Sequence, residues 1–231
     1  MKWLRFLLRS FLLSTLLLSS APWLQAQTGS ADETPASAPA PKVSFELNWK
    51  AANPEWYKVT VDRAGNAVYR SRAHSDPGEQ PSDPMVVRFT MSQQNVQQIF
   101  SLAKELNYFQ GNFSFRGKIA NTGDKTLTYA DGGKITKTTF NWSMNPKMMD
   151  MVELFQGMST TFEMGNRLRY AMRYDKLGVD SLLKSMEEMN KDHELVELQV
   201  LKPEFTEILN DPVTMNISKQ RIRRMLDSLP K

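Results

Sequence analysis

Histidine, the side chain that most often transfers protons near neutral pH, occurs at only two positions, His74 and His193. A catalytic nucleophile needs such a base beside it, and the sequence contains no Gly-x-Ser-x-Gly turn that would hold a strained serine. A cluster of carboxylates could instead act in pairs on glycosides, but it falls on the polar side of a predicted helix. Its members are Glu187, Glu188, Asp192 and Glu194. We therefore predict no catalytic residues, with an enzyme that uses carboxylates or His193 as the alternative.

Methionine is the one unusually abundant residue, and eleven of the 14 methionines lie from Met144 onward. Met148 with Met151, and Met186 with Met189, place pairs of thioethers within one helical turn. Thioethers bind Cu(I), so these four residues are candidate copper ligands. The competing interpretation is that methionine fills a helical core, because several of these positions share an apolar face with Leu and Phe. We favour the core and predict no cofactor.

Arginine-rich helix surfaces are the candidates for interaction. Arg167, Arg169 and Arg173 follow one another at the end of a long predicted helix, and Arg221 and Arg224 lie on the last one. Such cations could contact another envelope protein or an anionic membrane surface. The alternative is a solvated helix face whose cations complement the helix dipole.

The chain begins like a secretory signal, because Lys2, Arg5 and Arg9 precede an apolar run at 11–18, with cleavage expected at Ala26. This run is shorter than the roughly 20 residues that a membrane-spanning helix needs. We therefore expect the signal at 1–26 to be removed and no transmembrane span to remain. The protein is predicted to be exported, to the periplasm or outside the cell.

Removal of the signal lowers the formal net charge from +4 to +1, which argues against nucleic-acid binding. The chain has no cysteine, so a disulfide framework is excluded and stability must come from a buried core. We interpret the composition as that of a bacterial envelope protein. Residues 27–42 are rich in Ala, Pro and Ser and predict a linker.

The candidate residues above must be positioned by β-strands and α-helices. Alternation of apolar and polar residues predicts strands at 43–49, 56–62, 67–72, 85–90, 126–130 and 134–142. Turn residues at 63–66 and 131–133 predict two hairpins, and an apolar face at 92–106 predicts a helix between them.

A long helix is predicted from Pro146 to Tyr174, with Asn145 as its N-cap and apolar residues at helical spacing. Gly165 lies inside it, and we expect a kink or break there. Later segments read as helices, the last of them capped by Ser218. The predicted fold is α+β, with an antiparallel sheet and one packed helix at 43–145, joined by the long helix to a helical C-terminal region within 146–231.

The order of a Gly-turn hairpin at 57–69, a helix and a second hairpin resembles small bacterial exported domains of unknown function. These domains place a strand-Asp-x-x-Gly-Tyr hairpin before the helix, and the resemblance covers 57–162. A Cys-Pro pair that often precedes their first strand is replaced here by Asn53-Pro54-Glu55. The resemblance implies a fold and an exported location, and no activity.

From these observations we predict a non-catalytic exported envelope protein that serves as a protein-interaction or structural module. Its expected partner is another envelope protein, with peripheral membrane contact as a further possibility. The lesser alternative is a Met-rich Cu(I)-binding protein.

Overall fold

The computed structural model describes residues 40–75 and 83–229 of the chain. The predicted signal at 1–26 and most of the predicted linker at 27–42 lie outside the described residues. The described residues belong to one compact unit. Within the described part, no helix is both long and apolar enough to span a bilayer.

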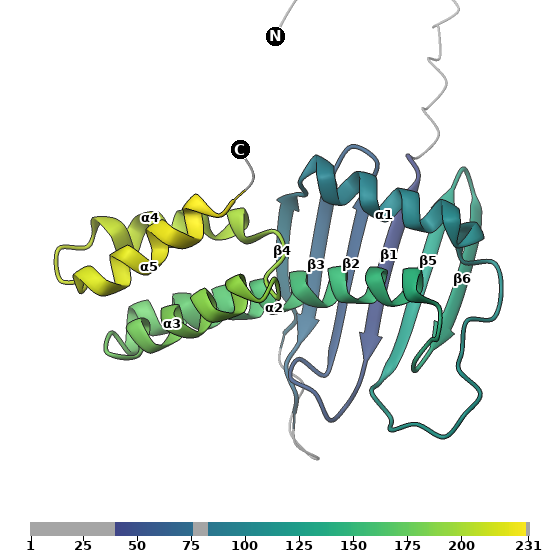
Figure 1. Ribbon diagram of the computed structural model, residues 1–231, viewed down its shortest axis with the longest axis horizontal. Coiled ribbons are helices and arrows are strands. Elements are labelled where there is room, and N and C mark those ends of the chain that lie inside the picture. The colour runs from purple at the N-terminus through teal and green to yellow at the C-terminus, as the bar shows by residue number, and fades with distance from the viewer. Residues whose placement is uncertain (1–39, 76–82, 230–231) are drawn as a thin grey trace, which may run out of the picture. The chain divides into compact units, whose positions relative to one another are not determined.

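Six strands form one sheet in the order β4-β3-β2-β1-β5-β6, and every neighbouring pair is antiparallel (Figure 1). The strands are β1 (Lys42–Asn48), β2 (Trp56–Asp62), β3 (Asn66–Arg72), β4 (Met85–Thr90), β5 (Asp124–Asp131) and β6 (Lys134–Phe140). Val43, Phe45 and Leu47 of β1 are buried, while Ser44 and Glu46 between them are half-buried on the other face. The period of two predicted from the sequence therefore sets which face of the sheet meets the core.

Two tight turns fix the hairpins that the sequence predicts. Gly65 joins β2 to β3 with a φ of +88°, and Gly132 and Gly133 join β5 to β6 with φ of +53° and +87°. These left-handed conformations are favourable mainly for glycine. Asp62 also stabilises the first turn, because its Oδ1 accepts hydrogen bonds from the backbone N–H groups of Ala64 and Asn66 at 3.0 and 2.9 Å.

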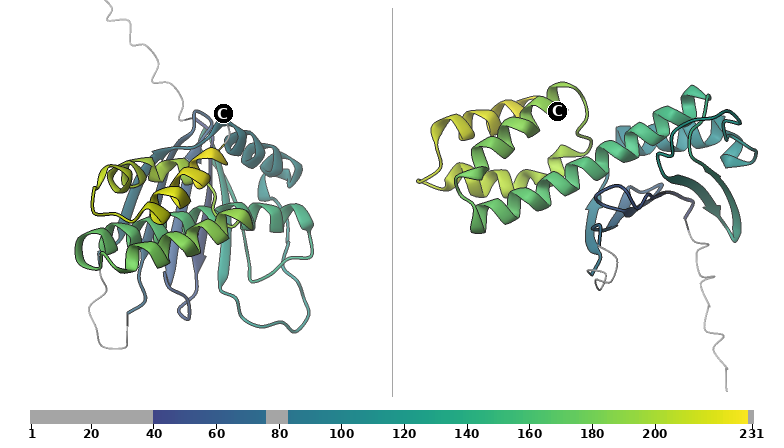
Figure 2. Two further views of the ribbon diagram at one scale, coloured as in Figure 1. Left: turned by 60° about the vertical axis from the view of Figure 1, so that its left-hand side comes forward. Right: turned by 90° about the horizontal axis from the view of Figure 1, so that it is seen from below.

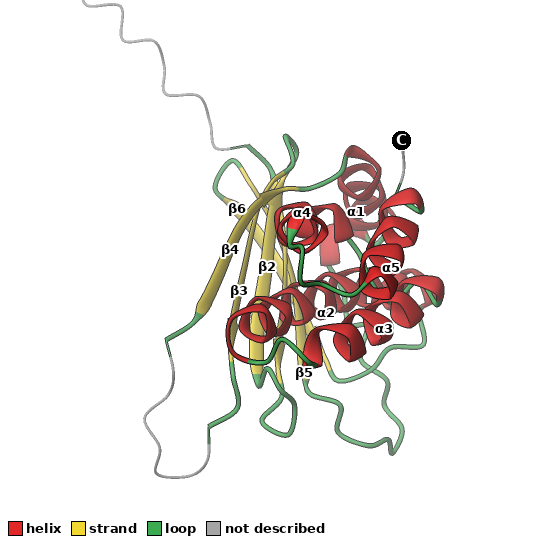
Figure 3. Ribbon diagram, turned by 90° about the vertical axis from the view of Figure 1, so that its left-hand side faces the viewer, coloured by secondary structure: helices red, strands yellow, loops and turns green. Residues whose placement is uncertain are grey.

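Helix α1 (Gln93–Glu105) and the first half of α2 (Pro146–Tyr174) lie across the same face of the sheet, as Figures 1 and 3 show. A short 3-10 helix, η1 (Asn107–Phe109), follows α1. The predicted cap of α2 is confirmed, because Asn145 Oδ1 accepts from Met148 N at 3.3 Å. Helix α1 is capped by Ser92, whose Oγ accepts from Asn95 N at 3.4 Å. Phe155 of α2 stacks on Phe45 of the sheet with ring centroids 5.3 Å apart.

The second half of α2 belongs to a helical C-terminal region (Figure 2). This region adds α3 (Gly178–Lys191), the 3-10 helix η2 (Leu198–Leu201), α4 (Lys202–Asn210) and α5 (Asn216–Asp227). Helix α2 contributes Met148 to Phe162 to the core beneath the sheet and Met164 to Ala171 to the core among the helices. The predicted α+β class is therefore confirmed, and one helix connects its two cores.

The expected kink at Gly165 does not occur, because α2 runs unbroken from Pro146 to Tyr174. Its glycines instead permit close packing. A Cβ at Gly157 would lie 2.5 Å from Val196 Cγ2, and a Cβ at Gly165 would collide with the side chain of Leu201. The segment before α4 can therefore lie directly against α2, at positions where glycine costs about 1 kcal/mol of helix propensity relative to alanine.

The predicted cap of the last helix is wrong. Helix α5 begins at Asn216, so Ser218 lies inside its first turn. The Ser218 hydroxyl is buried and donates to Asp180 Oδ1 of α3 at 2.9 Å. The Ser218 hydroxyl therefore bonds to a residue of another helix and not to the first turn of α5. The packing of α5 on α3 removes this hydroxyl from water, and Asp180 provides the hydrogen-bond partner that it then needs.

Candidate functional site

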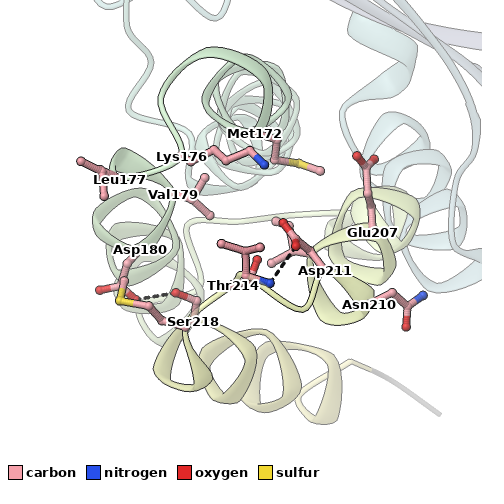
Figure 4. A pocket seen from close by; sticks show the side chains of 13 residues that line it. Met172, Lys176, Leu177, Val179, Asp180, Glu207, Asn210, Asp211, Thr214 and Ser218 are labelled. Carbon is pink, nitrogen blue, oxygen red and sulfur yellow. Dashed lines mark hydrogen bonds between the residues drawn. The ribbon is translucent and has the colours of Figure 1, made fainter.

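A pocket of about 580 Å³ opens in the helical C-terminal region (Figure 4). Its walls come from the end of α2, the turn into α3, the end of α4 and the loop between α4 and α5. The apolar lining residues are Met172, Leu177, Val179, Ile208, Val213 and Met215. This volume is in the range of pockets that bind small molecules or side chains of a partner protein.

Hydrogen bonds within the two turns hold the pocket walls in place. Asp175 Oδ1 accepts from the backbone N–H of Gly178 at 3.0 Å, which begins α3 directly after α2. Asp211 Oδ1 accepts from the backbone N–H of Val213 at 2.9 Å and shapes the loop that follows α4. Such short-range bonds favour a pocket that exists before any ligand arrives.

The floor and the rim of the pocket differ in exposure. Val179 and Ile208 on the floor are buried in the helical core. Leu177, Val213 and Met215 on the rim are 91%, 76% and 52% exposed. Three exposed apolar side chains around an apolar hollow form a patch of the kind that marks interaction sites.

Charges of both signs surround this patch. Lys176 comes from the α2–α3 turn, whereas Glu207 and Asp211 come from the end of α4 (Figure 4). Within the described residues, neither Lys176 nor Glu207 forms an ion pair. Asp180 at the deeper side is different, because Ser218 Oγ and Arg221 Nε hold it at 2.9 and 3.4 Å. Lys176 and Glu207 are thus available to pair with charges of a partner.

The arginines predicted for interaction fall into two groups. Arg169 pairs with Glu204 at 2.6 Å, and both Arg221 and Arg224 bind Glu187 at 2.9 and 2.6 Å. These three therefore join helices of the same chain. Arg167 and Arg173 are exposed on α2. A contact of these five arginines with a partner stays a prediction.

The sequence predicts that Glu187 lies on the solvated side of its helix, and this is wrong. Its side chain is buried between α3 and α5. Arg224 bonds its carboxylate most strongly, and together with Arg221 and Lys191 it lowers the pKa of Glu187 from 4.5 to about 2 although burial acts in the opposite direction. The signal that sequence reasoning missed is the pair of arginines three residues apart on the last helix, facing one acidic residue of α3. This cluster fastens α5 to α3.

The candidate copper ligands lie in two different places. Met148 and Met151 are fully buried in the core beneath the sheet, whereas Met186 and Met189 belong to the helical core. The four thioethers are therefore not brought together. In the described ranges, no three His, Cys, Asp or Glu side chains converge in a way that would hold a metal ion. A copper site stays a prediction without a geometric argument in its favour.

The two histidines lie outside the pocket lining. His193 is exposed after α3 with a φ of +61°, and His74 Nδ1 lies 3.8 Å from Glu55 Oε2. The alternative of a His193 enzyme therefore receives no support from the geometry of the pocket. Among the residues named for carboxylate catalysis, Glu187 is paired with arginines. The others, Glu188, Asp192 and Glu194, are exposed.

A polar cluster under the sheet joins Glu163 of α2 to β3. The hydroxyls of Tyr69 and Ser71 donate to Glu163 Oε1 at 2.8 and 2.7 Å, and the Tyr69 hydroxyl lies 2.9 Å from Ser159 Oγ. Burial raises the pKa of Tyr69, and the charge of Glu163 raises it further. These hydrogen bonds connect α2 to the sheet at a buried position.

Among the residues that the structure describes, Lys125 of β5 is the buried amine that could suggest chemistry. Its Nζ donates to the carbonyl oxygens of Thr122, Gly123 and Asn141 at 3.0, 3.3 and 2.8 Å. Burial lowers the pKa of this ammonium. All of its donors are thus engaged with backbone oxygens, which assigns Lys125 to holding the loop before β5 in place.

Comparison of the sequence with models of known protein families finds no match, and comparison with curated protein sequences finds no significant match. The function must therefore be argued from the pocket itself.

Proposed function

We propose that this chain is a non-catalytic exported binding protein of the bacterial envelope, whose pocket at the α2–α3 and α4–α5 turns accepts an apolar segment of a partner polypeptide. The observation that carries the proposal is the exposure of Leu177, Val213 and Met215 around an apolar floor. Export and the envelope location enter as expectations from the signal-like residues 1–26 and from the absence of cysteine.

The energetics favour a partner over water at this rim. Fully burying a side chain of the size of Leu, Val or Met stabilises a complex by about 1.5–3 kcal/mol. In the free chain, Leu177 and Val213 are 91% and 76% exposed. Most of this stabilisation is therefore gained only when a partner covers them. A partner that covers both therefore gains affinity without having to unfold any part of the pocket.

The proposal is tested by placing a photo-crosslinking amino acid at position 177 of the full chain and irradiating cells that export it. We expect discrete adducts that disappear when Val213→Asp is added, since that change puts a charge on the same rim. The matched control carries the crosslinker at Ile135, which is 67% exposed on β6. Equal adducts from positions 177 and 135, or adducts indifferent to Val213→Asp, would show that the pocket is not the binding site.

A further inference from the structure

We infer that the protein segment that enters this pocket belongs to a second copy of the same chain, bound across a two-fold axis. This inference rests on the proposed binding function and names the occupant of the pocket. It depends on three properties of the rim: its shape, its charges and its area.

The rim carries a projection and a hollow side by side. Leu177 projects from the α2–α3 turn with 91% of its surface exposed, beside a hollow of about 580 Å³ with Val179 and Ile208 on its floor. A two-fold interface brings the same patch of both copies together, so that each element meets its complement in the other copy. Leu177 of each copy then enters the hollow of its partner.

Two of the rim charges, Lys176 and Glu207, can be complementary to each other across a two-fold axis. Lys176 lies on the side of the α2–α3 turn, and Glu207 and Asp211 lie on the side of α4 (Figure 4). A partner with only one sign of charge would place like charges opposite each other on one of these sides. A second copy rotated by 180° instead offers Glu207 to Lys176 and Lys176 to Glu207.

The exposed apolar area predicts the strength of the association. Leu177, Val213 and Met215 together present on the order of 400 Å² per copy, below the roughly 800 Å² per partner of a standard stable interface. The dimer is therefore expected to be weak and reversible.

The first test measures the molar mass of the chain without residues 1–26 by sedimentation equilibrium from about 1 µM to about 500 µM. We expect a monomer–dimer equilibrium, and a dissociation constant at least about tenfold larger for Leu177→Glu. Ile135→Glu places the same charge on an exposed residue of the sheet and should leave the equilibrium unchanged. A helical circular dichroism spectrum and an unchanged melting temperature verify that each variant is folded.

The second test exchanges charges. Lys176→Glu and Glu207→Lys should each weaken self-association, because each places like charges across the axis. An equimolar mixture of these two variants restores both opposite-charge contacts and should dimerise as the native chain does. If Lys176 and Glu207 instead met charges of a different protein, mixing the two variants would not restore association.

A chain that stays monomeric at every concentration, or a dimer that survives Leu177→Glu, would overturn the inference. Sedimentation of the monomer with vesicles of anionic phospholipid, lost in Leu177→Glu, would assign the rim to a membrane instead. The crosslinking result at position 177 distinguishes a failure of the proposed binding function from a failure of the proposed occupant. Adducts of about twice the mass of the chain support the second copy, while adducts with a different protein retain the binding function and exclude the second copy.

Discussion

Glu187 offers the clearest link between a single charge and the stability of the helical region. Its side chain is only 6% exposed and accepts hydrogen bonds from Arg224 Nε at 2.6 Å and from Arg221 Nη1 at 2.9 Å. The change Glu187→Gln keeps the shape of the side chain and removes the charge that both arginines meet. We expect α5 to be held less firmly on α3, and the whole unit to unfold at a lower denaturant concentration.

The magnitude follows from the pKa. A carboxylate whose pKa falls from 4.5 to about 2 on folding contributes at most about 3 kcal/mol to the free energy of unfolding at neutral pH. Arg224 and Lys191 are 50% and 66% exposed, so solvent screens these pairs and reduces the contribution to about 1–2 kcal/mol. Because the folded-state pKa is the lower one, this stability is fully present above about pH 4.5 and is lost as the pH falls toward 2.

The assay is urea denaturation at several pH values between 7 and 3, followed by far-ultraviolet circular dichroism. The native chain should lose more stability than Glu187→Gln as the pH falls below 4.5, so that the two curves converge in acid. Glu188→Gln is the matched control, since Glu188 is exposed on the same helix. The reasoning is refuted if Glu187→Gln and Glu188→Gln have the same stability at pH 7, or if the difference between native chain and Glu187→Gln is independent of pH.

Two further changes test how the segment before α4 is attached. Gly157→Ala should destabilise the chain by about 1–3 kcal/mol despite the better helix propensity of alanine, because its Cβ would meet Val196 Cγ2 at 2.5 Å and the Glu194 carbonyl oxygen at 3.2 Å. Glu197→Ala should cost about 2–3 kcal/mol, because the buried Glu197 carboxylate accepts from Ser92 Oγ at 2.7 Å and from Ser92 N at 3.0 Å. Both are measured by urea denaturation, and Glu197→Ala also by faster hydrogen exchange at the start of α1.

Exposed neighbours provide the controls for these two changes. Gln156 lies beside Gly157 on the solvent side of α2, and the Glu194 carboxylate is exposed. The control changes are Gln156→Ala and Glu194→Ala. Both should change stability by no more than about 0.5 kcal/mol. If Gly157→Ala were stabilising, the close approach of Val196 to α2 would not exist in solution. If Glu197→Ala left exchange in α1 unchanged, the carboxylate would not hold the first turn of that helix.

The pocket could be foreseen only in part from the sequence. Leu177 and Val213 are apolar residues in segments otherwise made of turn formers, which is an unusual place for them. That signal marks two exposed apolar residues and does not reveal that they lie on one rim. They meet because α2 with α3, and α4 with α5, turn at the same end of the helical region, where both turns line the pocket.

The local sequence by itself determined where some elements begin and turn, because residues next to each other in the chain set those ends. Asn145 and Pro146 begin α2 because a side-chain acceptor and a residue without an N–H satisfy the first helical turn, and Gly132 and Gly133 form the β5–β6 turn because they tolerate positive φ. Only the tertiary structure decided the place of β1 between β2 and β5, the burial of Glu187 and the bond from Ser218 to Asp180. The physical reason is that these depend on groups far apart in the chain, whose desolvation and pairing energies arise only when packing brings them together.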